Sequence, residues 1–197
     1  MREVELKAVV DDIARGRKHL EKAGATLTFE GKLRDARYDL ESGDLARRDE
    51  VLRVRRYISK SETRAELDWK GPTESGDVYK VREEIATVVD DFDALTRILR
   101  RLGFTLIREI DRDIAQYELA GATIRFESYP RMDDLVEVEG EPEAIENAIE
   151  ALGIPRGTFT SDSLPAFVER FEQRTGVQAA TSDREMTENG GSKPFGR

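Results

Sequence analysis

Charged and apolar residues alternate along much of this chain. Between Glu3 and Lys7 the charged side chains fall on one face, and Val4 and Leu6 fall on the other. Because successive side chains of a strand point to opposite faces, this pattern predicts a strand with one charged and one apolar face. The segment 51–58 alternates in the same way. Further strands are predicted at residues 33–40, 65–70, 78–89, 105–119, 122–128 and 134–139.

Four segments have the apolar spacing of helices instead. They are residues 11–24, 90–102, 142–153 and 163–175, and the first three end at Gly24, Gly103 and Gly153. Pro142 stands at the start of the third, where proline is favoured. After Gly176 the apolar periodicity ends. We therefore expect one folded domain over residues 1–175 and a disordered tail over residues 176–197.

The strand faces collect both signs of charge. Carboxylates and cations lie on the charged faces of at least six predicted strands, and two strands carry a carboxylate pair two residues apart, Glu3/Glu5 and Glu137/Glu139. In a barrel, interior and exterior residues alternate along every strand. The pattern therefore predicts an α+β fold: an antiparallel, eight-stranded, closed or nearly closed barrel with a polar interior and helices packed outside. The alternative is a small acidic protein whose charged strand faces are solvated.

Composition limits the kind of function. The chain has 197 residues, a net charge of −9, no cysteine and one histidine, His19. These features argue against a general nucleic-acid binder, thiolate chemistry and a histidine-based hydrolase. No apolar run is long enough to span a membrane and no signal peptide is recognisable, so we expect a cytoplasmic protein without membrane partners.

A lumen with both charges has a specific chemical use. Arginine and lysine bind phosphate oxygens, and clustered carboxylates bind Mg²⁺ or Mn²⁺, which in turn contact the phosphates of a substrate. Such a site could stabilise the charge that develops during phosphoryl transfer. A glycine-rich phosphate loop of the Walker type is absent from the sequence.

An ordered series of motifs resembles a known family. In chain order these are Glu3-Val4-Glu5-Leu6-Lys7, Leu52-Arg53-Val54-Arg55, Trp69-Lys70-Gly71-Pro72, Arg82-Glu83-Glu84 and Val136-Glu137-Val138-Glu139. The series resembles the CYTH proteins, the triphosphate tunnel metalloenzymes, which include class IV adenylate cyclases, thiamine triphosphatases and inorganic triphosphatases. The resemblance extends from Glu3 to about Phe171.

The resemblance implies roles for particular residues. As metal ligands for Mg²⁺ or Mn²⁺ it implies Glu3, Glu5, Glu127, Glu137 and Glu139. As substrate-binding residues it implies Lys7, Arg53, Arg55, Lys70, Arg82 and Arg112, and as catalytic residues Glu3, Glu5, Lys7, Glu84 and Arg112. Glu84 would orient the basic residues or join the metal shell. The implied partner is a triphosphate small molecule, namely ATP, tripolyphosphate or thiamine triphosphate, bound to a monomer or homodimer.

Some positions depart from the family's pattern. Phe126-Glu127 replaces the usual Leu-Asp, and Arg131-Met132-Asp133 replaces Gly-Leu-Gly. Ile110 stands where a lysine is common, so that phosphate contact is either lost or supplied by Arg108. Arg37, flanked by Asp35 and Asp39, replaces an aromatic residue.

Two chemistries compete for such a site. A cyclase directs the ribose 3′-hydroxyl at the α-phosphorus and releases pyrophosphate, whereas a triphosphatase directs water at the γ-phosphorus. Overall family likeness places the class IV adenylate cyclase first, with a triphosphatase as the alternative. A polyphosphate- or nucleotide-binding module without catalysis is the second alternative.

Overall fold

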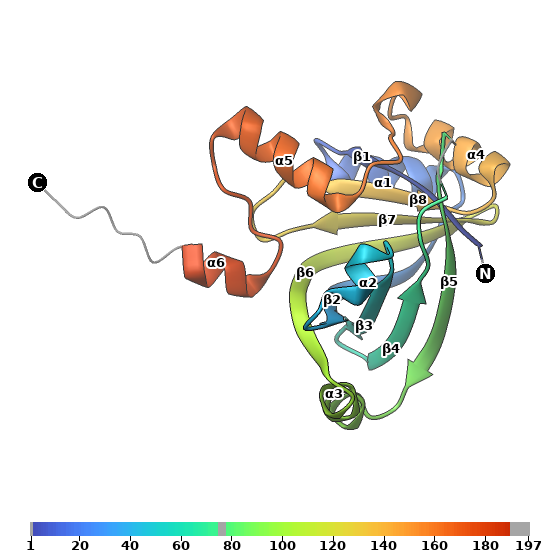
Figure 1. Cartoon of the computed structure of the whole chain (residues 1–197). Coiled ribbons are helices and arrows are strands. Elements are labelled where there is room, and N and C mark those ends of the chain that lie inside the picture. The colour runs from blue at the N-terminus through green and yellow to red at the C-terminus, as the bar shows by residue number, and fades with distance from the viewer. Residues whose placement is uncertain (1, 75–77, 190–197) are drawn as a thin grey trace, which may run out of the picture.

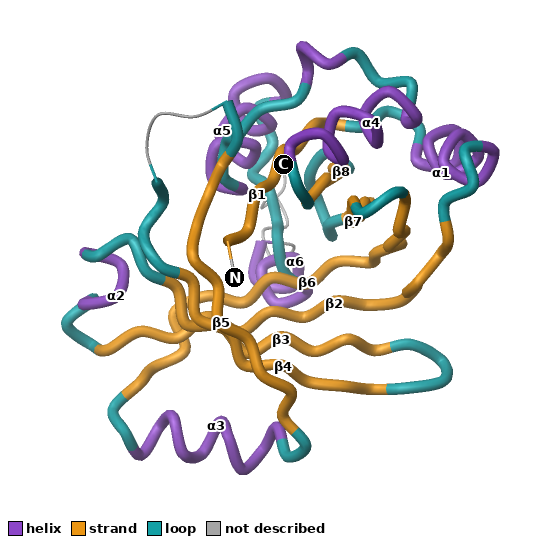
Figure 2. Tube along the Cα trace, turned by 90° about the vertical axis from the view of Figure 1, so that its right-hand side faces the viewer, coloured by secondary structure: helices purple, strands orange, loops and turns teal. Residues whose placement is uncertain are grey.

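The computed structural model describes residues 2–74 and 78–189. Within them, antiparallel strands form a closed barrel in the order β1-β5-β4-β3-β2-β6-β7-β8 (Figures 1 and 2). The strands are β1 (Arg2–Val9), β2 (Thr26–Leu40), β3 (Val51–Ile58), β4 (Thr63–Lys70), β5 (Lys80–Val89), β6 (Phe104–Leu119), β7 (Ala122–Ser128) and β8 (Leu135–Glu139). The α+β barrel predicted from alternation is confirmed. β2 is longer than predicted because it pairs with β6 from Thr26 to Leu40.

Helices lie on the outside of the barrel (Figure 1). They are α1 (Ile13–Lys22), α2 (Asp44–Arg47), α3 (Phe92–Arg101), α4 (Pro142–Leu152), α5 (Leu164–Thr175) and α6 (Asp183–Asn189), with a 3₁₀ turn at Arg156–Thr158. The sequence predicted α1, α3, α4 and α5 but neither α2 nor α6. None of the described helices combines the length and apolar character needed to cross a bilayer.

The main hydrophobic core lies between the barrel wall and two helices. The outward faces of β1, β7 and β8 contribute Leu6, Phe126 and Val138, which are fully buried. Leu20 of α1 and Ile149 of α4 close the core from the other side. Because these strands bury their apolar residues outward, their charged residues point into the barrel. Burial of each large apolar side chain contributes about 1.5–3 kcal/mol to this arrangement.

Three smaller hydrophobic clusters lie elsewhere along the wall, and one of them joins Phe29 and Leu33 of β2 to Tyr57 of β3 and Ile114 of β6. α3 packs Leu99 against Tyr38 of β2 and Val54 of β3. α5 packs Phe167 against a cluster that contains Ile110 and Leu135. Figure 1 shows α3 at the opposite end of the barrel from α1, α4 and α5.

The segment after α5 departs from the sequence prediction. We expected disorder from residue 176, because apolar periodicity ends there, but Ala180 and Thr181 are buried. The backbone of Ala180 exchanges hydrogen bonds with Arg131, and the Asp111 N–H donates to the carbonyl of Thr181 over 2.8 Å. Small residues that dock through backbone hydrogen bonds leave no periodic apolar signal, which explains the difference. The remainder of the predicted tail, residues 190–197, lies outside the described residues.

Candidate active site

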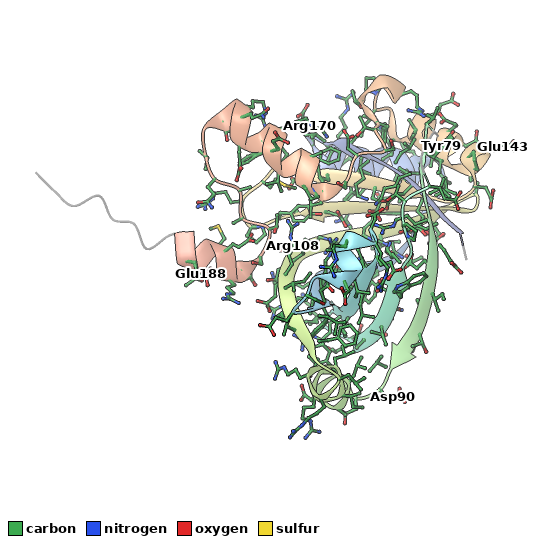
Figure 3. The ribbon with its side chains drawn as sticks, in the orientation of Figure 1. Tyr79, Asp90, Arg108, Glu143, Arg170 and Glu188 are labelled. Atoms are coloured by element: carbon green, nitrogen blue, oxygen red, sulfur yellow. The ribbon has the colours of Figure 1, made fainter. Side chains whose placement is uncertain are left out.

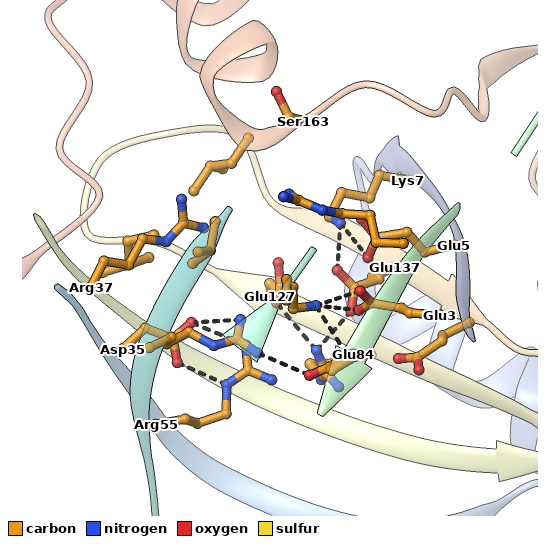
Figure 4. Close-up of a pocket in the computed structure, with 18 of the residues that line it drawn as sticks. Glu3, Glu5, Lys7, Asp35, Arg37, Arg55, Glu84, Glu127, Glu137 and Ser163 are labelled. Atoms are coloured by element: carbon orange, nitrogen blue, oxygen red, sulfur yellow. Dashed lines mark hydrogen bonds and ion pairs between the residues drawn. The ribbon is translucent and has the colours of Figure 1, made fainter. Parts of the chain in front are cut away.

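The barrel encloses a charged cavity of about 600 Å³. All eight strands contribute to its lining, and the first residues of α5 stand at one side of it (Figure 4). The cavity lining includes all twelve residues to which the family resemblance gave metal, substrate or catalytic roles: Glu3, Glu5, Lys7, Arg53, Arg55, Lys70, Arg82, Glu84, Arg112, Glu127, Glu137 and Glu139. Arg108, the other candidate for a phosphate contact, is not among the lining residues. The charged strand faces therefore point inward, and the alternative of solvated outer faces is wrong.

One wall of the cavity is acidic. β1 and β8 pair so that Glu5 lies opposite Glu139 and Lys7 lies opposite Glu137. The Lys7 ammonium is 2.6 Å from a Glu137 oxygen and 2.9 Å from a Glu5 oxygen. Lys70 binds Glu3 from the neighbouring side of the barrel. The register thus gathers four carboxylates from two adjacent strands.

Burial and charge act against each other on these carboxylates. Burial raises the pKa of Glu5, but Lys7 and Lys80 outweigh it and lower that pKa to about 2. For Glu137, Lys7 and Arg125 likewise overcome burial and hold the pKa well below its usual range. Glu139 behaves differently: burial and the nearby Glu137 raise its pKa to about 7. Among the described residues no cation forms an ion pair with Glu139, and the more distant charges of Arg125 and Lys70 offset the rise only in part.

The opposite wall carries arginines around one buried carboxylate. Asp35 of β2 accepts from the Arg55 Nε and Nη2 over 2.8 and 3.0 Å and from the Arg112 Nη1 over 3.1 Å. Arg53 is 3.5 Å from the same carboxylate and 2.9 Å from Asp68. Burial raises the pKa of Asp35, but Arg112, Arg55 and Arg53 hold it well below its usual range. Asp35 therefore fixes the guanidinium groups in place.

Two further predicted carboxylates, Glu84 and Glu127, have partners that bear on their roles. Glu84 lies 3.3 Å from Lys70 and 3.6 Å from Arg53, between the two walls (Figure 4). Glu127 accepts from the Arg112 Nε over 2.8 Å and from the Tyr129 hydroxyl over 2.6 Å. To bind a metal ion, Glu127 would have to release its hydrogen bonds with Arg112 and Tyr129.

Arg82 lines the cavity but holds the chain around it. Its Nε donates to the carbonyl of Gly71 over 2.5 Å, and its Nη2 donates to the carbonyl of Asp49. Its role in substrate binding stays a prediction, because a phosphate would have to compete with these loop carbonyls.

Sequence reasoning gave no site role to several residues that the structure places in the lining. Lys80 binds Glu5, Arg125 donates to Glu137 over 2.7 Å, and Tyr129 orients Glu127. Each lies two residues from a predicted site residue on the same strand or its extension. The period of two was the signal that could have identified them.

Comparison with known proteins identifies the family. Residues 1–156 match the CYTH domain. The chain belongs to the CYTH family. The family includes enzymes, and the CYTH fold binds triphosphate substrates. No curated protein sequence matches this chain significantly.

Solved structures share the CYTH fold of this chain. The PH1819 protein of Pyrococcus horikoshii OT3 is 25% identical, with a TM-score of 0.71 over 85% of this chain and 99% of that one. A proposed adenylate cyclase of Vibrio parahaemolyticus is 16% identical, with a TM-score of 0.72 over 85% and 97%. HpAC1 of Hippeastrum, a proposed adenylyl cyclase described as having a dominant triphosphatase activity, is 14% identical, with a TM-score of 0.57 over 98% and 97%.

Membership in the CYTH family implies a divalent metal ion, and the acidic wall has suitable donors. Hard divalent cations prefer carboxylate oxygens. Two like charges opposite each other in a sheet are destabilising, so the pair Glu5 and Glu139 would gain from a cation between them. In residues 2–74 and 78–189 no three acidic or histidine side chains are already gathered into a metal site. Glu3 and Glu5 are turned onto lysines instead, and an ion would take the place of those contacts.

Proposed function

We propose that this CYTH protein is a Mg²⁺- or Mn²⁺-dependent enzyme that hydrolyses the terminal phosphate of a triphosphate. The observation that carries the proposal is the division of one enclosed cavity into an acidic wall and an arginine wall. Phosphoryl transfer needs positive charge around the phosphate oxygens and a hard cation that bridges them. This cavity offers the side chains for both.

The arginine wall supports the binding of the phosphates. The arginines of this wall, Arg53, Arg55 and Arg112, are nearly completely buried, and each already forms an ion pair with a carboxylate. A guanidinium binds the oxygens of a carboxylate and of a phosphate with the same forked geometry. Phosphate oxygens would join or replace these carboxylates. Lys7 and Lys70 would contact the substrate from the acidic side. Because these side chains are nearly completely buried, each of their charges acts more strongly than it would at the surface.

The acidic wall supports the metal site. Glu3, Glu5, Glu137 and Glu139 are the residues that would hold the ion. When bound, a divalent ion supplies polarisation of the phosphoryl oxygens and activation of water. Glu84, between Lys70 and Arg53, would keep these two cations in position along the substrate.

The aromatic lining supports hydrolysis over cyclisation, which reverses the order expected from family likeness. A cyclase has to hold a nucleoside so that its 3′-hydroxyl reaches the α-phosphorus. Tyr57 and Tyr129 are the aromatic residues that line the cavity. Tyr129 donates to Glu127, and the Tyr57 ring packs edge-on against Phe29 with centroids 5.3 Å apart. The Arg64 guanidinium carbon lies 3.9 Å from the Tyr57 ring centroid, and that of Arg112 lies 6.0 Å from the Tyr129 ring centroid, so a base would meet rings that already have cationic neighbours. The phosphate-binding cations, by contrast, are abundant in the lining.

The proposal is tested with purified full-length protein, Mg²⁺ or Mn²⁺, and ATP, tripolyphosphate and thiamine triphosphate in parallel. We expect release of orthophosphate that stops when EDTA removes the metal. Cyclic AMP with pyrophosphate would instead establish the cyclase. Tight binding of tripolyphosphate without turnover of any substrate would establish a binding module and contradict the proposed enzyme.

Variants test the assigned metal ligands. Glu137→Gln and Glu139→Gln each should lower turnover by more than about 100-fold, the scale of losing a main electrostatic contribution. Glu143→Gln is the matched control, because Glu143 is exposed on α4 (Figure 3). Normal rates in both cavity variants would show that the metal site lies elsewhere.

A further inference from the structure

Three arginines stand side by side across adjacent strands of the barrel. Arg37 on β2 lies directly opposite Arg53 on β3 and Arg108 on β6. Like charges opposite each other in a sheet are destabilising. The repulsion between these three guanidinium groups is relieved only where an anion binds them.

Arg53 has its anion within the protein, but Arg37 does not. Arg53 binds Asp68 over 2.9 Å. No hydrogen bond or ion pair of Arg37 is found with the described residues, and its Nε is screened from solvent without an acceptor. Burial, together with the charges of Arg53 and Arg108, lowers the pKa of Arg37 to about 10. A cation held in this state is stabilised by any anion that reaches it.

The two carboxylates beside Arg37 in the sequence are engaged elsewhere. Asp35 binds Arg55 and Arg112. The Asp39 carboxylate accepts from the backbone N–H groups of Leu45 and its neighbour at the start of α2, over 3.0 Å each. Neither can turn to Arg37 without giving up these partners.

Other cations of the lining contrast with Arg37. Lys7, Arg53, Arg55, Lys70, Lys80, Arg112 and Arg125 each form an ion pair with a carboxylate. In Figure 4 Arg37 lies apart from Glu3, Glu5 and Lys7, on the far side of the cavity, with its guanidinium directed toward the side where Ser163 stands. Figure 3 places the neighbouring Arg108 on β6 near α6. Arg37 therefore extends the cationic surface beyond the residues expected to hold three phosphates.

We propose that Arg37 binds an additional phosphate, so that the preferred ligand is a linear inorganic polyphosphate of four or more phosphates. The inference rests on the proposed phosphate-binding function of the cavity. A further phosphate fits better than a nucleoside, because the group at this position is a cation and the lining tyrosines are already engaged. Arg108 supports the same group by adding positive charge from β6.

Binding measured by calorimetry, with EDTA present and at fixed ionic strength, tests this assignment without requiring turnover. The ligands are tripolyphosphate, tetrapolyphosphate and ATP. We expect the intact protein to bind tetrapolyphosphate about tenfold more tightly than tripolyphosphate, the effect of one charge-assisted contact. Arg37→Gln should remove that preference while changing tripolyphosphate affinity by less than about threefold, and Arg37→Lys should restore part of it.

Lys32→Gln is the matched control. Lys32 lies on the same strand with an exposed side chain, so its removal should leave the preference for tetrapolyphosphate unchanged. Urea unfolding of each variant separates a loss of binding from a loss of folding.

The outcomes distinguish this inference from the proposed function. If tripolyphosphate binds the intact protein neither in EDTA nor with Mg²⁺ added, the phosphate-binding function itself is wrong. If tripolyphosphate binds but the longer chain binds no better, or if its advantage survives in Arg37→Gln, only the assignment of Arg37 is overturned. Should Arg37→Gln fail to fold, the intact protein and Arg37→Lys still decide the question, since equal affinities for the two chains would refute it.

Discussion

Asp35 should be the most sensitive carboxylate of the arginine wall. In Asp35→Asn the amide keeps one acceptor and turns a donor toward guanidinium N–H groups. Arg53 and Arg112 keep Asp68 and Glu127 as partners, but Arg55 has no other carboxylate among the described residues. Removing one partner of a buried ion pair costs about 3–5 kcal/mol. Because only one of the three arginines loses its counter-ion, we expect a loss of unfolding free energy at the lower end of this range, about 3 kcal/mol.

The loss is measured by urea unfolding, monitored by circular dichroism. The substitution should lower the urea concentration at the midpoint of unfolding without changing the dependence of the unfolding free energy on urea concentration. In a thermal scan it corresponds to about 6–12 °C for a chain of this size. Asp113→Asn is the control, because the Asp113 side chain is 68% exposed and its pair with Lys32 spans 3.4 Å. That change should stay within about 0.5 kcal/mol. A loss below about 1 kcal/mol in Asp35→Asn would refute the view that Asp35 holds the arginine wall.

The stability difference between the intact protein and Asp35→Asn should also depend on added tripolyphosphate and on pH. Tripolyphosphate should raise the melting temperature of Asp35→Asn more than that of the intact protein, because it supplies Arg55 with a counter-ion. The pKa of Asp35 is depressed in the folded protein against about 3.9 in the unfolded chain. Its contribution is therefore complete above about pH 4 and is lost as pH falls through the lower folded value. The stability difference between the two proteins should be constant from about pH 8 to 5 and narrow below about pH 4.

Two further predictions concern the scaffold. Gly31→Ala would place a Cβ 2.3 Å from the carbonyl oxygen of Ile58 in the neighbouring strand, so we expect a loss of about 1–3 kcal/mol in urea unfolding. Gly157→Ala, which meets nothing within 4 Å, should be close to neutral. Ala180→Glu would bury a charge where the side chain is 0% exposed, and limited proteolysis should then cleave the segment before α6 faster. Val177→Glu, at a position 45% exposed, should leave the cleavage rate unchanged.

The inward-facing residues could be predicted because alternation is a local property. Once Val4 and Leu6 are assigned to the core, Glu3, Glu5 and Lys7 must share the opposite face, whatever the rest of the chain does. The same reasoning placed Arg53 and Arg55 together. The order of the motifs then indicated that these faces meet in one cavity, and the closed barrel confirms that they do.

Partner choice could not be predicted in the same way, because it depends on strands that are distant in the sequence. Asp35 and Arg112 are brought together by the pairing of β2 with β6, and nothing local indicates that contact. Arg82 shares a face with Glu84, yet its guanidinium goes to the carbonyls of Gly71 and Asp49, which only the closed loops bring near. An alternating pattern therefore identifies which charges enter the lumen but not which of them neutralise each other.

Arg37 shows what that distinction means for function. In the sequence it stands between Asp35 and Asp39, an arrangement that suggests an internally neutralised cation. Three-dimensional pairing assigns one carboxylate to Arg55 and Arg112 and the other to the start of α2, and so leaves Arg37 without a partner among the described residues. A stable fold has to neutralise most of the charge in the lumen, and here carboxylates neutralise most of the lining cations. At those cations a phosphate chain would have to compete with a carboxylate. At Arg37 a ligand would meet no such competition, so the gain on binding should be largest there.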